Sequence, residues 1–204
     1  MEKMKAKDFI TLGIFTVLFF VIVMAFVFGT TVTVVTYAFA PAFAAIPGAI
    51  IYMLMRAKVT KPWGITLSGV VMGLLEFLVG AGVGIALGFI IGALIAEGVS
   101  YIGKYKKYTL NTLGYALYMC SFAIGTYAPM VYMTEYVDSM SESNSVNTDF
   151  LTRLHEFMSG PMVALIVVVT FLASILGAII AKAVLKKHFE KAGIITGKTN
   201  KNCA

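Results

Sequence analysis

The chain has 204 residues, of which 59% are hydrophobic and only 13% are charged. This composition excludes a soluble domain, because its long apolar runs exceed what a soluble core buries, and it indicates a protein embedded in lipid. The formal net charge of +6 does not indicate nucleic-acid binding, because the basic residues lie between hydrophobic runs instead of sharing one water-facing stretch.

The apolar runs predict membrane-spanning helices. A bilayer crossing needs about 20 apolar residues, and only helices or closed barrels satisfy their backbone in lipid. Alternating apolar and polar residues, the barrel signature, are absent. The first predicted helix covers residues 8–28 and is too long for a cleaved signal peptide. The second covers residues 32–55 and contains Pro41 and Pro47, so we expect it to be kinked or broken.

A short basic loop with Arg56, Lys58 and Lys61 follows, and Pro62 suits the first turn of a third helix over residues 62–79. The fourth helix, residues 81–102, forms a tight hairpin with the third through the glycines around Gly80. The fifth covers residues 110–136. A polar segment over residues 138–149 follows, and the sixth helix starts after residues 159–161 and extends to about residue 188.

The basic residues predict the orientation. Placing successive loops on alternating sides collects nearly all Lys and Arg on one side and leaves Arg153 alone on the other, and basic loops stay in the cytoplasm. We therefore predict an all-α polytopic membrane protein with six transmembrane helices in one domain (residues 1–190), a basic cytoplasmic tail (residues 191–204), and both termini cytoplasmic. The expected location is a cell membrane, which the chain crosses several times.

A stripe of small residues marks the predicted fourth helix. Gly80, Gly84, Gly88, Gly92 and Ala96 follow one another at a four-residue period, which places them on one helix face. Such stripes let helices approach closely. The stripe either packs against another helix of this chain or docks a partner; the second interpretation makes Gly84, Gly88 and Gly92 docking residues.

Two acidic residues lie within predicted spans. Glu76 is placed near the centre of the third helix, where a carboxylate is expensive unless it faces a partner, water or a ligand, or is held protonated. We favour substrate binding over a structural hydrogen bond for Glu76. Glu97 lies closer to the cytoplasmic end, within reach of Lys104, and we expect it to be structural.

A candidate ligand region lies toward the outer side. The end of the fifth helix carries Tyr127, Met130 and Tyr132, and the next segment carries Arg153 and His155. Aromatic and methionine side chains with a few polar groups line many small-molecule pockets, although tyrosines are equally common as interfacial anchors. The two histidines, His155 and His188, fall on opposite sides, so neither a metal site nor a histidine dyad is expected.

Nothing in the sequence indicates catalysis or a cofactor. Cys120 and Cys203 are read as free thiols. Residues 193–199 imitate a phosphate-binding loop but have three residues between their glycines instead of four, and lack the flanking strand and helix. We therefore expect no enzyme activity, and any pumping requires an ATPase partner or an ion gradient.

Several short motifs together resemble a known family. They are residues 12–17 (LGIFTV), the proline-broken second span, residues 72–78 (MGLLEFL), residues 103–107 (GKYKK) and residues 111–115 (NTLGY). In this order the chain resembles the Trep_Strep family of bacterial integral membrane proteins. That family looks like the substrate-binding S components of energy-coupling factor (ECF) transporters.

The resemblance implies an importer subunit that captures a vitamin or other micronutrient outside and delivers it through a membrane T component driven by two cytoplasmic ATPases. It also implies docking through a small-residue motif on the first helix, here Gly13 with Thr16 or Val17. The substrate stays open among a vitamin, haem and a metal chelate. The main alternative is a self-sufficient gradient-driven carrier or channel that uses Glu76.

Overall fold

The structure, a computed structural model, describes residues 4–133 and 148–186. Their elements are all helices, which confirms the all-α prediction. The helices are α1 (Ala6–Gly29), α2 (Val34–Ala38), α3 (Ala40–Lys58), α4 (Gly64–Leu78), α5 (Val83–Ile102), α6 (Tyr108–Tyr132), α8 (Thr148–Phe157) and α9 (Gly160–Val184).

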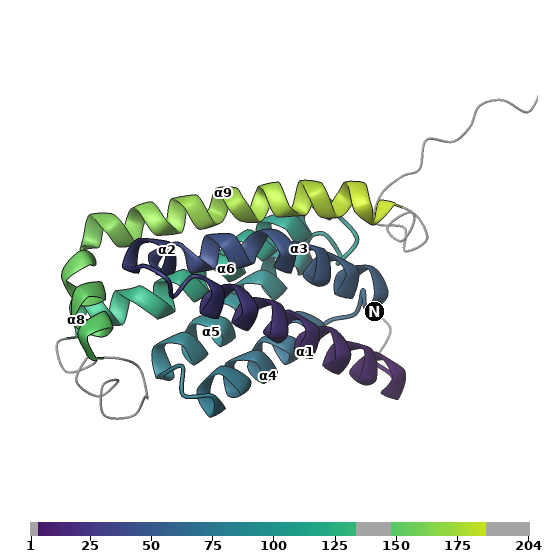
Figure 1. The fold of residues 1–204 in the computed structure, drawn as a ribbon. Helices are drawn as coiled ribbons and strands as arrows, with labels where there is room; N and C mark the ends of the chain where they lie inside the picture. Colours follow the sequence, from purple (N-terminus) through teal and green to yellow (C-terminus); the bar gives the residue numbers. More distant parts are fainter. Residues whose placement is uncertain (1–3, 134–147, 187–204) are drawn as a thin grey trace, which may run out of the picture.

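The long helices form a closed ring of neighbours. Going round the bundle, α1 packs on α4, α4 on α5, α5 on α6, α6 on α9, α9 on α3, and α3 back on α1 (Figure 1). Helix α3 also touches α6 across the ring. Because successive long helices run in opposite directions, one end of the bundle collects the starts of α1, α4 and α6, and the other end collects their last turns.

The predicted break in the second span is present. Helix α2 ends at Ala38 and α3 begins at Ala40, so the interruption falls at Phe39, just before Pro41. Pro41 occupies the first turn of α3, where its missing N–H leaves no helical bond unmade. Pro47 lies inside α3. The predicted start of the next helix at Pro62 is wrong: α4 begins at Gly64, after Trp63 in a left-handed conformation with φ 67°.

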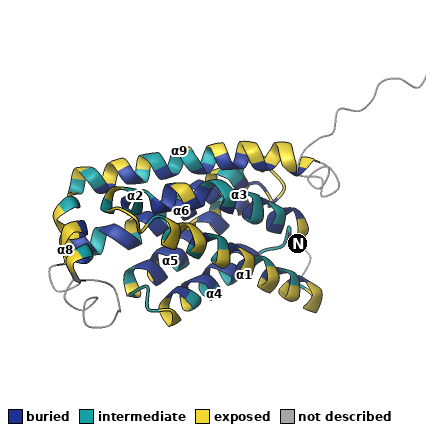
Figure 2. Cartoon of the chain, viewed as in Figure 1, coloured by how far each residue is buried: buried dark blue, intermediate teal, exposed yellow. Residues whose placement is uncertain are grey.

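Apolar side chains cover the outside of the bundle as well as its core. In Figure 2 the outward faces of α1 and α9 show many exposed residues, among them Ile14 on α1 and Leu172 on α9, at 56% and 60% exposure. Among the described residues, α1, α3, α5 and α9 are long and apolar enough to cross a membrane, while α4 is apolar but has 15 residues. The six-span count and the cytoplasmic placement of the termini stay predictions.

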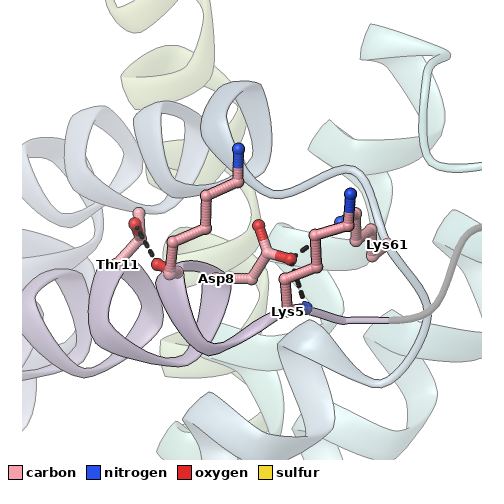
Figure 3. Close-up of polar contacts among 5 residues, drawn as sticks. Lys5, Asp8, Thr11 and Lys61 are labelled. Atoms are coloured by element: carbon pink, nitrogen blue, oxygen red, sulfur yellow. Dashed lines mark hydrogen bonds and ion pairs between the residues drawn. The ribbon is translucent and has the colours of Figure 1, made fainter.

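Basic residues gather at the end of the bundle where α1 begins. There the Asp8 carboxylate accepts hydrogen bonds from the Lys5 backbone N–H and the Lys61 ammonium, both at 2.7 Å (Figure 3). The ion pair ties the start of α1 to the α3–α4 connection. We call this the basic end, and the opposite one the α8 end. The positive-inside rule predicts that the basic end faces the cytoplasm.

Arg56 was predicted to lie in a basic loop, and this is wrong. It belongs to the last turn of α3 and is completely buried, with its guanidinium 5.0 Å from the centre of the Tyr105 ring. Glu97 lies nearby on α5 and contributes negative charge. Burial and the Glu97 carboxylate raise the pKa of the Tyr105 hydroxyl above its ordinary value. An apolar bundle therefore contains a buried charged cluster at its basic end.

Glu97 also holds the start of α4. Its carboxylate accepts backbone N–H groups from Trp63 at 2.6 Å, Ile65 at 3.0 Å and Thr66 at 3.2 Å. The first N–H groups of a helix have no partner within the helix, and a carboxylate there also complements the helix dipole. Glu97 therefore has the structural role expected for it. It hydrogen-bonds the backbone at the start of α4, whereas the sequence suggested Lys104 as its partner.

The small-residue stripe is an internal helix contact. A Cβ on Gly88 would lie 2.7 Å from the Ser121 carbonyl oxygen of α6, and one on Gly92 would lie 2.8 Å from the Ser121 Cβ. The predicted docking role is therefore wrong for Gly88 and Gly92, because α6 already covers them. Gly84 approaches α6 at Gly125 in the same contact. Gly80 is not on the helix at all, since α5 begins at Val83.

Helix α8 was not predicted. It begins within the segment expected to be polar, and its apolar residues Leu151 and Leu154 are buried with residues of α6 and α9. Leu151 and Leu154, with Phe150 and Phe157, fall at helical spacing, which makes α8 amphipathic. It closes the α8 end of the bundle beside α2 (Figure 1).

Candidate functional site

A cavity of about 150 Å³ lies inside the ring of helices near the α8 end. Every helix of the ring except α9 contributes to it, and α2 adds one side. Its walls come from four parts of the chain: α1 (Met24, Val27, Phe28), the α2–α3 break (Tyr37, Ala40, Pro41), the end of α4 with the following turn and α5 (Glu76, Val79, Gly80, Ala81, Ile85), and α6 (Phe122, Thr126, Tyr127). The cavity therefore unites segments far apart in the sequence.

Glu76 is the acidic residue in this wall. It is 1% exposed, and its Oε1 atom has no hydrogen-bond partner among the described residues. The predicted position near the helix centre is wrong, because Glu76 lies in the last turn of α4, which ends at Leu78. The structure thus buries Glu76 within the bundle, at the end of α4 and not at its centre.

The turn after α4 fixes this position. The Ala81 N–H donates to the Glu76 carbonyl at 3.0 Å and the Gly80 N–H donates to the Phe77 carbonyl at 3.0 Å. Together they form a Schellman motif, which requires a left-handed residue after the helix. Gly80 supplies it with φ 83°. The glycine-rich connection therefore ends α4 so that Glu76 lies beside the cavity.

The neutral polar groups of the wall are already engaged. The Tyr127 hydroxyl donates to the Tyr37 carbonyl at 2.6 Å, and the Thr126 hydroxyl donates to the Phe122 carbonyl at 2.8 Å. Tyr127 is buried, as expected of a predicted substrate-binding residue. Because its hydroxyl forms a hydrogen bond from α6 to α2, Tyr127 contributes mainly its aromatic ring to the cavity wall.

Helix α8 reaches the cavity through one of its walls. The Tyr37 ring meets the Phe150 ring of α8 edge to face, with centroids 5.4 Å apart, and meets the Tyr127 ring edge to face at 6.5 Å. Since Tyr37 lines the cavity, α8 directly contacts a residue of the cavity wall.

The other predicted substrate residues lie elsewhere. Met130 is buried in an apolar cluster with residues of α8 and α9, and Tyr132 is 73% exposed at the end of α6. Arg153 lines a separate surface hollow beside α2, and His155 is exposed on α8. The structure thus brings Glu76 and Tyr127 together and leaves Met130, Tyr132, Arg153 and His155 outside the cavity.

The predicted docking residues of α1 fall on two faces. Gly13 and Val17 are exposed, and an added Cβ on Gly13 meets no atom within 4 Å. Thr16 faces inward and its hydroxyl lies 2.7 Å from the Ser68 hydroxyl of α4, so the docking prediction is wrong for Thr16. Gly13 and Val17 belong to an open apolar face of α1.

Sequence reasoning missed most of the cavity wall. Tyr37, Phe122 and Thr126 face it from helices that are mostly apolar and aromatic, so neither hydropathy nor spacing set them apart. Within residues 4–133 and 148–186, no three His, Cys, Asp or Glu side chains gather as metal ligands would. Cys120 is buried as a free thiol, while Cys203 and the loop-like residues 193–199 lie outside the described residues.

Comparison with known proteins gives the family. No curated protein and no solved structure is significantly similar to the chain. The model of one family, described as hypothetical bacterial integral membrane protein (Trep_Strep), matches residues 6–191. The chain therefore belongs to the Trep_Strep family and is a multi-pass bacterial integral membrane protein.

Proposed function

We propose that this protein is the substrate-capture subunit of an ECF-type importer, which takes up a small molecule outside the cell and passes it on through a membrane T component driven by two cytoplasmic ATPases. It performs no catalysis itself. The observation that carries the proposal is the cavity beside Glu76, a space inside the helix ring lined by one carboxylate and otherwise mostly apolar groups.

The position of the cavity supports capture from outside. It lies near the α8 end, opposite the basic end that the positive-inside rule assigns to the cytoplasm. A ligand entering from outside would reach it after crossing only part of the bundle. Toward the basic end, packed side chains fill the ring around Tyr115 and Met119, both fully buried. Passage of the ligand to the other side therefore requires a partner protein or a rearrangement of the helices.

The outer face of α1 supports a membrane partner. Only a narrow stripe of α1 packs inside the bundle, while Ile10, Ile14 and Val17 are each more than half exposed. Gly13 lies among them and has open space where a side chain would be. A glycine within an exposed apolar helix face allows a second helix to approach closely in lipid.

The test is affinity purification of the tagged full chain from its native bacterium in mild detergent, with mass spectrometry of what co-purifies. The variant Gly13→Leu fills the space on α1. The matched control is Gly98→Leu, an exposed glycine of α5 where an added Cβ also meets nothing within 4 Å.

We expect a T component and two ATPases to co-purify with the wild type and with Gly98→Leu. Clearly less of all three proteins should co-purify with Gly13→Leu. Recovery of the chain alone, under conditions that keep a known coupling complex intact, would contradict the proposal. That result would favour an independent carrier that uses Glu76.

A further inference from the structure

We propose that the cavity beside Glu76 selects a small molecule about the size of one aromatic ring that carries a cationic nitrogen, such as an ammonium group. This names the substrate class of the site and rests on the proposed capture function. Charge, hydrogen bonding and size lead to it separately.

Charge favours a cation over an anion. Glu76 is the acidic residue of the wall, and the described lining includes no Lys, Arg or His that would offset it. A carboxyl group buried among helices in a membrane is costly to ionise without a partner, and the Oε1 atom lacks one. A positively charged ligand group provides that partner, whereas a second carboxylate or a phosphate would be repelled.

Hydrogen bonding favours a ligand that donates. The hydroxyls of Thr126 and Tyr127 already donate to backbone carbonyls, and the N–H groups of Gly80 and Ala81 are used in the turn after α4. These hydroxyl oxygens and the Glu76 carboxylate can still accept. A ligand that brings donors matches these acceptors, and an ammonium group brings three.

Size and wall chemistry limit the rest of the ligand. A cavity of about 150 Å³ lined by apolar side chains is the size that holds benzene. A macrocycle such as haem does not fit. Tyr37, Phe122 and Tyr127 offer ring surfaces that pack against an aromatic body and attract a nearby cation.

The test measures ligand binding to the purified full chain in nanodiscs by isothermal titration calorimetry. The probes are benzylammonium and phenethylammonium, compared with benzyl alcohol, which is neutral, and benzoate, which is anionic. The variant Glu76→Gln keeps the shape of the side chain and removes its charge. Its control is Glu156→Gln, an exposed acidic residue of α8 outside the cavity. A second variant, Ala81→Leu, fills the cavity and leaves Glu76 in place.

We expect saturable binding of at least one ammonium probe to the wild type and to Glu156→Gln. Glu76→Gln should bind it about 10- to 100-fold more weakly, the loss typical of one charged hydrogen bond. Ala81→Leu should weaken both the ammonium probe and benzyl alcohol, and benzoate should not bind.

Three results would overturn the inference: neither ammonium probe binds the folded wild type, benzoate or benzyl alcohol binds as tightly as the ammonium probes, or Glu76→Gln binds them unchanged. The proposed function fails separately. If the ammonium probe binds but no T component co-purifies, the substrate class stands and the coupling partner does not. If the T component co-purifies with Glu76→Gln while no probe binds, the coupling partner stands and the substrate class does not.

Discussion

Replacing Glu97 by Gln should destabilise the bundle strongly. The carboxylate accepts three backbone N–H groups at the start of α4 and provides negative charge close to Arg56, whose three guanidinium nitrogens have no hydrogen-bond partner among the described residues. Gln keeps one acceptor oxygen but loses the charge. Removing one side of a buried charge pair typically costs about 3–5 kcal/mol, because the other charge stays buried.

In a protein of this size, such a loss lowers the unfolding midpoint by on the order of 10 °C. The assay is thermal unfolding of the purified protein in detergent, followed by intrinsic fluorescence. Glu156→Gln is the control, since a change at an exposed site alters stability by less than about 0.5 kcal/mol. Unfolding of Glu97→Gln within about 1 °C of the wild type would refute this account of the buried cluster.

Two further predictions concern packing. Gly88→Leu should abolish the folded protein, because a Cβ there would already lie 2.7 Å from the Ser121 carbonyl oxygen. Gly98→Leu should elute normally in size-exclusion chromatography, and equal behaviour of the two variants would contradict the close α5–α6 contact. Tyr115→Phe should cost about 1 kcal/mol in denaturant unfolding, since it removes the buried hydroxyl that donates to the Ala45 carbonyl at 2.7 Å. An unchanged midpoint would mean that this bond does not stabilise the bundle.

The sequence predicted the helices well, because each long apolar run needs a helix in lipid. The break before Pro41 and the turn at Gly80 also follow from backbone rules that hold in any surroundings. Helix α8 was missed because residues 148–157 are largely polar, and no helix was predicted between the polar segment and the sixth span.

Which side each helix turns inward was much harder to predict. In a membrane protein the lipid-facing side is as apolar as the core, so hydropathy does not distinguish the two. Thr16 was assigned to docking from the motif that the family resemblance implies, although its hydroxyl faces Ser68. Arg56 was assigned to a loop because it is charged, although it is buried. Glu76 was identified because an acidic residue in an apolar run needs a partner, but its neighbours in the cavity come from helices that only the fold brings together.

The most direct test of the central claim is to identify the small molecules that co-purify with the protein. Wild-type and Glu76→Gln chains, purified from the native bacterium in parallel, are denatured and the released compounds are compared by mass spectrometry. We expect a small compound with a basic nitrogen that is retained by the wild type and by Glu156→Gln and lost from Glu76→Gln. Identical compound profiles for the wild type and Glu76→Gln would contradict a ligand site at this cavity.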